Sequence, residues 1–297
     1  MTTPVTTPLL SPQLLAQLER LELVSRKIFR GRMKGERRSN RKGQSVEFSD
    51  FRNYVPGDDL RFIDWNLYAR LDRLFLKLFL EEEDLHFYAL VDASDSMSFG
   101  EPSKLLYAKQ LAAALSFIGL CRADRVKVEA LGASRENPGP VMRGRANVWR
   151  MLEYLDQLEA GRNVPLSQSV KDFALCNSGK GIVVILSDLM DKTGYEAALN
   201  FLLARQMDVY VIHILAPEEL QPEIKGDLKL VDAEDGDIAE ITVSRPLLDR
   251  YQRTLAAFIE GAREFCTRRG MSYLTTSTAT PVDQIVAGYL RKKGLVR

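Results

Sequence analysis

Three short polar side chains follow an apolar run in the first third of the chain. The run 86–91 is followed by Asp92, Ser94 and Ser96, in the spacing Asp-x-Ser-x-Ser. Because the run is apolar on both faces, it predicts a buried central strand that ends at these residues. Ligands bind at the carboxyl ends of strands in open α/β sheets. A carboxylate and two hydroxyls there suit Mg²⁺, which prefers oxygen ligands.

The same residues have a simpler interpretation as caps of a following helix. Serine and aspartate accept hydrogen bonds from the unpaired N–H groups at a helix start. The motif alone supports both interpretations equally, because such residues are common in strand-to-helix loops. A second apolar run, 181–187, also ends in a carboxylate, Asp188. Two parallel strands that deliver acids to one sheet edge favour a metal site made by Asp92, Ser94, Ser96 and Asp188.

A catalytic set is harder to assemble from this sequence. An aspartate at a strand end can act as a phosphoryl-accepting nucleophile, but the haloacid-dehalogenase pattern needs a second aspartate where this chain has Ser94. The two histidines, His86 and His213, fall in expected strands and are interpreted as core residues. No P-loop, dinucleotide fingerprint or nucleophile elbow is present. We expect no enzyme activity; the alternative is a metal-dependent phosphoesterase or other hydrolase that uses Asp92 and Asp188.

Composition and charge narrow the class of protein. The 297 residues are 45% hydrophobic and 27% charged with a net charge of +1, which predicts a sizeable core and makes nucleic-acid binding by the whole chain unlikely. The three cysteines form no CxxC pair, so a zinc site or disulfide framework is not expected and a reducing, cytoplasmic setting is. No run of 18 apolar residues is present, so no membrane span is expected.

From residue 86 onward, apolar strands alternate regularly with amphipathic helices. This alternation predicts a mainly parallel central sheet with helices on both faces. The expected strands are 86–91, 125–131, 180–186, 209–215 and 271–276. The expected helices are 103–122, 147–158, 165–177, 195–205, 246–269 and 281–293. Residues 226–243 interrupt the alternation, and the turn Asp235-Gly236 predicts a β-hairpin there. Ser11 and Pro12 predict the start of an N-terminal helix that reaches about residue 29.

A basic tract with interleaved glycines covers residues 26–42. One interpretation is an electrostatic arm for nucleic acid or an anionic lipid surface. Only one aromatic residue, Phe29, lies within it, so base stacking has little support and nucleic acid is an unlikely partner. A solvated strap or protein-docking segment is the favoured interpretation, because charge runs most often have that role. An anionic-surface binder remains the second alternative function.

Aromatic residues and alternating charges mark the segment 46–70. One interpretation is a folded insert held by Arg–Asp pairs around a small aromatic core. The other is a partner-recognition surface, since Arg, Tyr and Trp dominate binding hot spots. The candidate partner-binding residues there are Arg52, Tyr54, Asp58, Arg61 and Trp65. Residues 74–80 predict a strand.

This segment, which reads Val46-Glu-Phe-Ser-Asp-Phe-Arg-Asn-Tyr-Val-Pro-Gly57-Asp-Asp-Leu-Arg61-Phe-Ile-Asp64-Trp65, resembles the signature of the domain of unknown function 58 (DUF58) family. The Asp-x-Ser-x-Ser motif is similar to that of von Willebrand factor A-type domains, which hold a cation in a metal-ion-dependent adhesion site (MIDAS). The resemblance implies a von Willebrand factor A-like, Rossmann-like fold. It also implies an adaptor or assembly factor that acts with a MoxR-type AAA+ ATPase. The family site implies Mg²⁺, with Mn²⁺ or Ca²⁺ as substitutes.

One position departs from the family pattern. The MIDAS needs a threonine on a second loop, where this chain has Arg162, which offers no lone pair. Asn163 or Ser167 are the candidates to supply the missing oxygen, and Arg162 is also a candidate partner-binding residue. We therefore expect a degenerate site that holds Mg²⁺ weakly, or an Arg–Asp pair in place of the metal.

The expected organisation has three parts. Residues 1–39 form an N-terminal helix and basic arm, and residues 40–83 form the family signature segment. Residues 84–297 form the von Willebrand factor A-like domain, with the hairpin insertion at 226–243. A segment of about 40 residues is near the lower limit for autonomous folding. We therefore expect residues 40–83 to pack on the main domain, together with the hairpin.

Overall fold

The chain divides into two compact units. The computed structural model describes residues 9–23, 47–80, 85–132, 138–161, 164–177, 181–224, 226–231, 237–292 and 294–296. The larger unit joins Met1–Arg30 to Leu85–Arg297, and the smaller unit is Gly31–Asp84. The basic tract 26–42 lies outside the described residues. The packing of segment 40–83 on the main domain stays a prediction.

A six-stranded sheet forms the centre of the larger unit. Its spatial order is β10-β7-β6-β3-β4-β5, and every neighbouring pair is parallel except β4 and β5. The strands are β3 (His86–Asp92), β4 (Arg125–Leu131), β5 (Val141–Arg143), β6 (Gly181–Ser187), β7 (Asp208–Leu215) and β10 (Ser272–Ser277). The mainly parallel α/β fold is therefore confirmed, with the strand that begins at His86 in the interior of the sheet.

The strand order places a reversal between β3 and β6. We number the six strands of this sheet by their order in the chain and go across the sheet from β5 to β10. The order is then 3-2-1-4-5-6, which is the doubly wound order of Rossmann-like folds. Connections from β3 run towards one edge of the sheet, and those from β6 run towards the other. The crevice at such a switch point, outside the carboxyl ends of the strands, is where ligands bind in these folds. Asp92 and Asp188 lie at that point.

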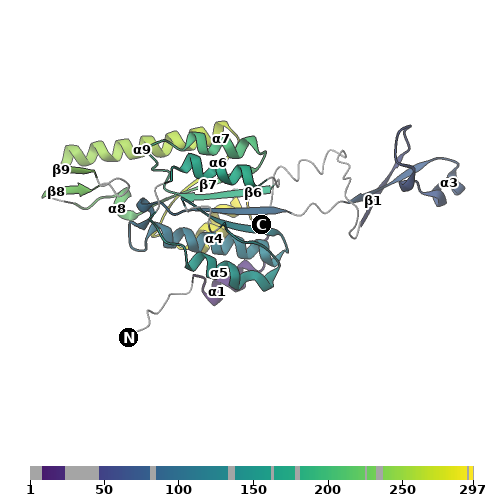
Figure 1. Ribbon diagram of the computed structural model, residues 1–297, viewed down its shortest axis with the longest axis horizontal. Helices are drawn as coiled ribbons and strands as arrows, with labels where there is room; N and C mark the ends of the chain where they lie inside the picture. Colours follow the sequence, from purple (N-terminus) through teal and green to yellow (C-terminus); the bar gives the residue numbers. More distant parts are fainter. Residues whose placement is uncertain are drawn as a thin grey trace. The chain divides into compact units, whose positions relative to one another are not determined.

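Helices cover both faces of the sheet (Figure 1). One core contains residues of α1 (Pro12–Leu18), α4 (Lys104–Cys121), α5 (Val148–Asp156) and the π-helix η4 (Gln284–Leu290). The other contains residues of α6 (Leu166–Cys176), α7 (Glu196–Ala204) and α9 (Arg245–Arg268). Strand β3 serves both, because Ala89 and Val91 face the first core while Tyr88 and Leu90 face the second. This explains why its sequence is apolar without alternation.

Helix α4 is the central helix of the first core. By length and composition it could cross a membrane, but 78% of its apolar window is buried inside the protein. Its first turn is capped by Ser103, whose Oγ accepts a hydrogen bond from the Leu106 N–H at 3.2 Å. It therefore packs as the core helix of a globular unit, with Lys104 at its first position.

The hairpin and the helices at the chain ends differ in part from expectation. Strands β8 (Gly226–Val231) and β9 (Ile238–Val243) form the predicted antiparallel hairpin. The N-terminal helix ends at Leu18, before the expected residue 29, and Leu23 then forms a bridge with Val296. The bridge needs extended backbone at Leu23, so the leucine spacing there reflects core packing rather than a continued helix.

The smaller unit is a hairpin with short helical turns. Strands β1 (Glu47–Asn53) and β2 (Phe75–Leu80) pair antiparallel, with the 3₁₀ turn η1 (Leu60–Phe62) and helix α3 (Trp65–Leu71) between them. The Asp58 carboxylate accepts two hydrogen bonds from Arg52, at 2.7 and 2.8 Å, and one from the Val55 N–H. The expected Arg–Asp pair is thus present.

The aromatic residues of the smaller unit do not form the small core that one interpretation expected. Trp65 is 60% exposed and Phe62 is 46% exposed, and no residue of α3 is buried. Tyr54 is half-buried and Arg61 is exposed, paired with Asp59. The described part of the unit is held by the paired strands and the Arg52–Asp58 contact, and between β1 and β2 it exposes Val55, Leu60, Phe62, Trp65, Tyr68 and Leu71.

The pairing of β3 with β6 can be tested at Gly181. A Cβ at this residue would lie 1.9 Å from the His86 carbonyl oxygen, so Gly181→Ala must displace backbone. We expect it to lower the free energy of unfolding by about 1 to 3 kcal/mol, as overpacking commonly does. Chemical denaturation measures this. The matched control is Gly288→Ala, where a Cβ meets no atom within 4 Å. Equal stability of the two variants would contradict the assigned register.

Candidate functional site

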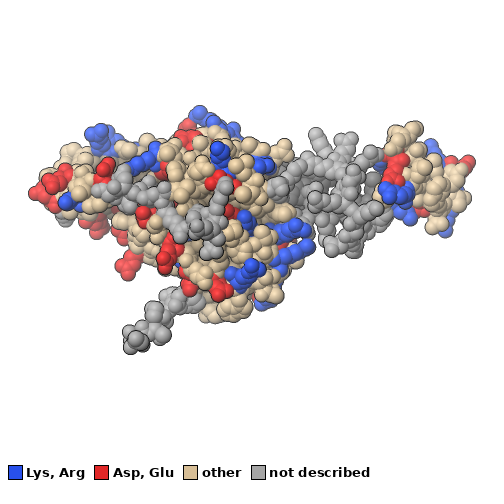
Figure 2. Space-filling view, viewed as in Figure 1, with Lys and Arg blue, Asp and Glu red and all other residues tan. Residues whose placement is uncertain are grey.

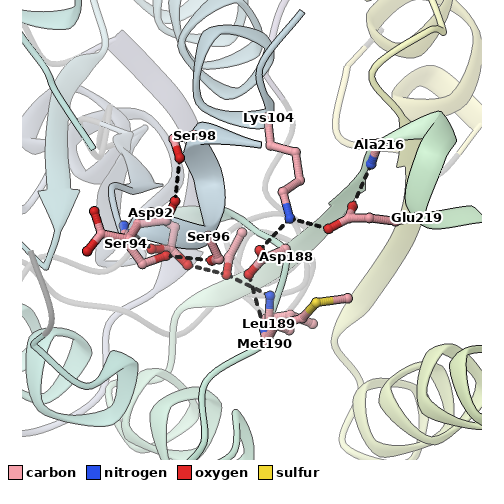
Figure 3. Close-up of polar contacts among 12 residues, drawn as sticks. Asp92, Ser94, Ser96, Ser98, Lys104, Asp188, Leu189, Met190, Ala216 and Glu219 are labelled. Atoms are coloured by element: carbon pink, nitrogen blue, oxygen red, sulfur yellow. Dashed lines mark hydrogen bonds and ion pairs between the residues drawn. The ribbon is translucent and has the colours of Figure 1, made fainter. Parts of the chain in front are cut away.

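The two sequence-predicted acids meet at the switch point of the sheet. Residues Val91 and Leu186 are register partners, so Asp92, the last residue of β3, and Asp188, the first residue after β6, lie at nearly the same level. The Ser187 Oγ donates a hydrogen bond to the Asp92 Oδ2 at 2.5 Å, which links the two strand ends. Figure 3 shows both carboxylates with the serines of the following loop.

The loop after β3 arranges the serines around Asp92. The Ser94 N–H donates to the Asp92 Oδ1 at 3.0 Å, and the Ser94 and Ser96 hydroxyls lie 3.1 Å apart. Ser94 precedes the 3₁₀ turn η2 (Asp95–Ser98) but its side chain caps no N–H there. Helix α4 is capped by Ser103 instead. The simple capping interpretation of Ser94 is therefore wrong, and its hydroxyl remains beside the carboxylates.

A pocket of about 140 Å³ opens at this point. Among the described residues, its polar lining consists of Asp92, Ser94, Asp188, Asp191, Lys192 and Thr193. Asp191 was not among the predicted site residues. Its carboxylate accepts hydrogen bonds from the Leu166 N–H at 2.5 Å and from the Thr193 N–H at 2.6 Å. It therefore ties the loop after β6 to the start of α6.

Two other predicted site residues, Ser96 and Ser167, are not among the described lining residues of this pocket. Ser167 lies in the first turn of α6. Arg162 and Asn163 lie outside the described residues, so their proposed roles stay predictions. Gly161, just before them, donates its N–H to the Ala93 carbonyl at 3.2 Å, which brings the start of that loop next to the site.

A buried lysine completes the site and was missed from the sequence. The Lys104 Nζ donates to the Asp188 Oδ2 at 2.7 Å and to the Glu219 Oε1 at 2.6 Å, and the Lys104 side chain is 1% exposed. Figure 3 shows the ammonium between the two carboxylates. One feature of the sequence could have indicated this lysine, namely its place in the first turn of an apolar helix. The helix dipole disfavours a cation there unless acids compensate it.

Burial and charge shift the pKa values of these groups in different directions. Burial and the charge of Asp188 together raise the pKa of Asp92 to about 6, against the lowering effect of the hydrogen bonds from Ser187 and Ser94. Burial alone would lower the pKa of Lys104, but the charges of Asp188 and Glu219 outweigh it, so this pKa is raised. Lys104 therefore remains an ammonium, while Asp92 has no cationic partner among the described residues.

The donor set fits a hydrated divalent cation. Asp92, Ser94 and Ser96 supply oxygen atoms only, as Mg²⁺ prefers. Asp92, Asp188 and Glu219 with Lys104 carry a formal charge of −2, opposite to that of Mg²⁺. Only two of these carboxylates line the pocket, and no group of three or more His, Cys, Asp or Glu suited to a metal occurs in the described residues. Such a site relies on hydroxyls and water for its remaining ligands.

The histidine of β7 has a structural role. His213 is fully buried, its Nδ1 lies 2.6 Å from the Tyr273 hydroxyl, and its ring packs edge-on against Phe258. Burial lowers the pKa of His213 to about 4, so it is neutral at physiological pH. It lies in the interior of the sheet, as the sequence predicted, and it does not line the pocket.

The raised pKa of Asp92 predicts a pH-dependent stability. The folded state favours protonated Asp92. The contribution of Asp92 to the free energy of unfolding is therefore complete below pH 3.8 and is lost as the pH rises through about 6. The loss amounts to about 3 kcal/mol. Asp92→Asn cannot ionise, so in EDTA we expect its melting temperature relative to the wild type to rise between pH 4 and pH 8.

The control for this measurement is Asp249→Asn, at an exposed position of α9. Its melting temperature relative to the wild type should change little over the same range. A pH-independent difference for Asp92→Asn would mean that Asp92 is ionised throughout, and the assigned pKa would be wrong.

Comparison with known proteins places the chain in a family. A Mycobacterium tuberculosis protein described as uncharacterized is 28% identical over 251 residues, covering 83% of this chain and 79% of the relative. An aerotolerance-related membrane protein from Bacteroides fragilis has 13% identity, covers 71% of this chain and 98% of that chain, and gives a TM-score of 0.44. A von Willebrand factor type A structure from Catenulispora acidiphila has 17% identity, covers 61% of this chain and 43% of that chain, and gives a TM-score of 0.35.

These TM-scores are low, and the strand order and parallel register described above show a doubly wound, Rossmann-like α/β fold. The family model described as Protein of unknown function DUF58 matches residues 50–258, which is more than half of the chain. The chain belongs to the DUF58 family.

Proposed function

We propose that this DUF58 protein is a non-enzymatic interaction protein whose strand-end site holds a divalent cation, Mg²⁺ in the first instance. The cation would leave one coordination position for a carboxylate of a protein partner. The single observation that carries the proposal is the convergence of Asp92, Ser94 and Asp188 on one pocket at the switch point of the sheet.

The electrostatics of the pocket support a cation in preference to other ligands. Asp92 is buried beside Asp188, and both features disfavour its charged form. A divalent ion at this place reverses that penalty, because attraction between opposite charges is strong where water is excluded. The partner class that the family resemblance implies is a MoxR-type AAA+ ATPase. A cytoplasmic location is part of the proposal and is compatible with three free cysteines.

The smaller unit supplies a second candidate contact for the partner. Exposed apolar side chains on it are Phe51, Val55, Leu60, Phe62, Trp65, Tyr68 and Leu71. Trp65 and Tyr68 also contact edge-on, with ring centroids 6.1 Å apart. Contiguous exposed apolar surface marks interaction sites, and exposed aromatic anchors are typical of binding hot spots. This favours the partner-recognition interpretation of segment 46–70.

A metal-dependent hydrolase has weaker support. Such an enzyme needs a general acid or base within reach of the metal-bound water. No histidine is present among the described lining residues of the pocket, and the Lys104 ammonium is bound to two carboxylates. Among the described lining residues, Asp92, with a pKa of about 6, is the group suited to proton transfer. Hydrolysis of p-nitrophenyl phosphate that requires both Mg²⁺ and Asp92 would favour the hydrolase.

Calorimetric titration with Mg²⁺ tests the site directly. We expect the wild type to bind one Mg²⁺ weakly and Asp92→Ala to lose binding, because the variant removes a buried charged ligand. Asp249→Ala on α9 is the matched control and should bind as the wild type does. Absence of binding at millimolar Mg²⁺, in the wild type and in Arg162→Thr, would end the metal proposal and leave the strand-end residues a structural role.

Partner binding is tested with a purified MoxR-type AAA+ ATPase from the same organism. We expect binding that is lost in EDTA, and we expect Trp65→Ala to weaken it at least about tenfold, as removal of a hot-spot aromatic does. Trp149→Ala is the control, since Trp149 is 80% exposed on α5 in the other unit. Equal losses in both variants would exclude a specific role for the smaller unit.

A further inference from the structure

We propose that Lys104 is an exchangeable counter-cation of the strand-end site. In the absence of metal it is shared by Asp188 and Glu219. When a divalent cation binds beside Asp92, the cation takes over Asp188 and leaves Lys104 with Glu219 alone. Cation binding thereby reaches the segment that carries Glu219. This inference rests on the proposed function, because it assumes a cation at the site.

The contacts of Lys104 are those of a shared ion rather than of a single pair. Its ammonium lies 2.7 Å from Asp188 and 2.6 Å from Glu219, so neither acid holds it alone. The phenyl ring of Phe99 lies 5.9 Å away on the loop after the serines, within range of a cation–π contact. Glu219, with a side chain that is 14% exposed, is the more solvated of the two acids. It can therefore keep the ammonium when Asp188 is withdrawn.

The exchange follows from the charges around Asp188. Asp188 uses one oxygen for Lys104 and the other for the Met190 N–H at 3.1 Å. A divalent cation beside Asp92 attracts Asp188 with twice the charge of an ammonium and repels Lys104 at the same time. Both effects weaken the Lys104–Asp188 contact. Lys104 needs no new partner, because Glu219 is already in hydrogen-bond contact with it.

Glu219 connects this exchange to distant parts of the larger unit. Its Oε2 accepts a hydrogen bond from the Ala216 N–H at 2.7 Å, at the start of α8 (Pro217–Leu220). Its carbonyl oxygen accepts a hydrogen bond from the Tyr251 hydroxyl at 2.8 Å, which joins α8 to α9. A change in the pairing of Glu219 therefore acts on the end of β7, on α8 and on the exposed N-terminal half of α9.

Two substitutions with opposite expected effects test the proposal by calorimetric Mg²⁺ titration. Lys104→Met keeps the length of the side chain and removes the competing charge, so the affinity for Mg²⁺ should rise at least about tenfold. Glu219→Gln leaves Asp188 as the one carboxylate partner of Lys104. Because Lys104 then holds Asp188 more strongly, the affinity for Mg²⁺ should fall. Lys109→Met, on the same helix, is the control and should leave the affinity unchanged.

Stability measurements cover the case in which Lys104→Met folds poorly. This variant leaves Asp188 and Glu219 buried without a cation, so Mg²⁺ should raise its melting temperature more than it raises that of the wild type. Hydrogen exchange adds a readout of the connection. Mg²⁺ should change amide protection over 216–221 and around Tyr251 in the wild type, and this change should be absent in Lys104→Met.

The outcomes separate this inference from the proposed function. If the wild type binds Mg²⁺ and Lys104→Met binds with equal or lower affinity, the Lys104 proposal is wrong and the cation site stands. If the wild type shows no binding but Lys104→Met binds, Lys104 is confirmed as the competing cation and the metal-dependent function is wrong for the native chain. If neither protein binds, both proposals are wrong.

Discussion

The central constraint on this structure is the burial of negative charge at the point where the sheet reverses its strand order. Two parallel strands deliver Asp92 and Asp188 to one crevice, where Ser187 connects their ends. An unpaired charge removed from water is costly. Lys104 supplies the compensating positive charge. It does so from the first turn of α4, a position where the helix dipole disfavours a cation. The Lys104 ammonium on the apolar helix α4 contacts both Asp188 at the sheet edge and Glu219 on α8.

Much of this arrangement was predictable from the sequence, for identifiable reasons. Strands β3 and β6 are apolar on both faces, which marks them as interior, and parallel strands must end at the same edge. Asp92 and Asp188 were therefore expected together. The contacts of Lys104 were not expected, because Asp188 lies 84 positions and Glu219 lies 115 positions farther along the chain. In addition, a lysine at a helix start is usually solvated. Glu219 reaches Lys104 only because the fold brings α8, which follows β7, next to the start of α4.

The smaller unit was less predictable for a related physical reason. Alternating acids and arginines are compatible with a compact insert and with a recognition surface, since both use Arg–Asp pairs. The Arg52–Asp58 pair is present, yet Trp65 and Phe62 remain exposed. Hydrophobic composition alone cannot distinguish a small core from an exposed apolar face in a segment this short. Among the side chains of β1 and β2 whose burial the structure describes, at 51–53 and 75–77, Leu76 alone is buried, so these side chains cannot enclose the aromatic residues.

A resident lysine also explains how a cation site can act as a signal. Where metal ligands have no other counter-charge, metal binding and folding become one event, and the domain needs metal to exist. Lys104 offsets part of the buried charge, and we therefore expect the larger unit to fold before a cation binds. Asp92, whose pKa is raised to about 6, contributes the remaining instability. On the proposed mechanism, cation binding then redistributes charge between Asp188 and Glu219 in a domain that is already folded. A folded domain with two charge distributions is the requirement for coupling between sites. The contacts of Glu219 with Ala216 and Tyr251 give that coupling a physical route to α9.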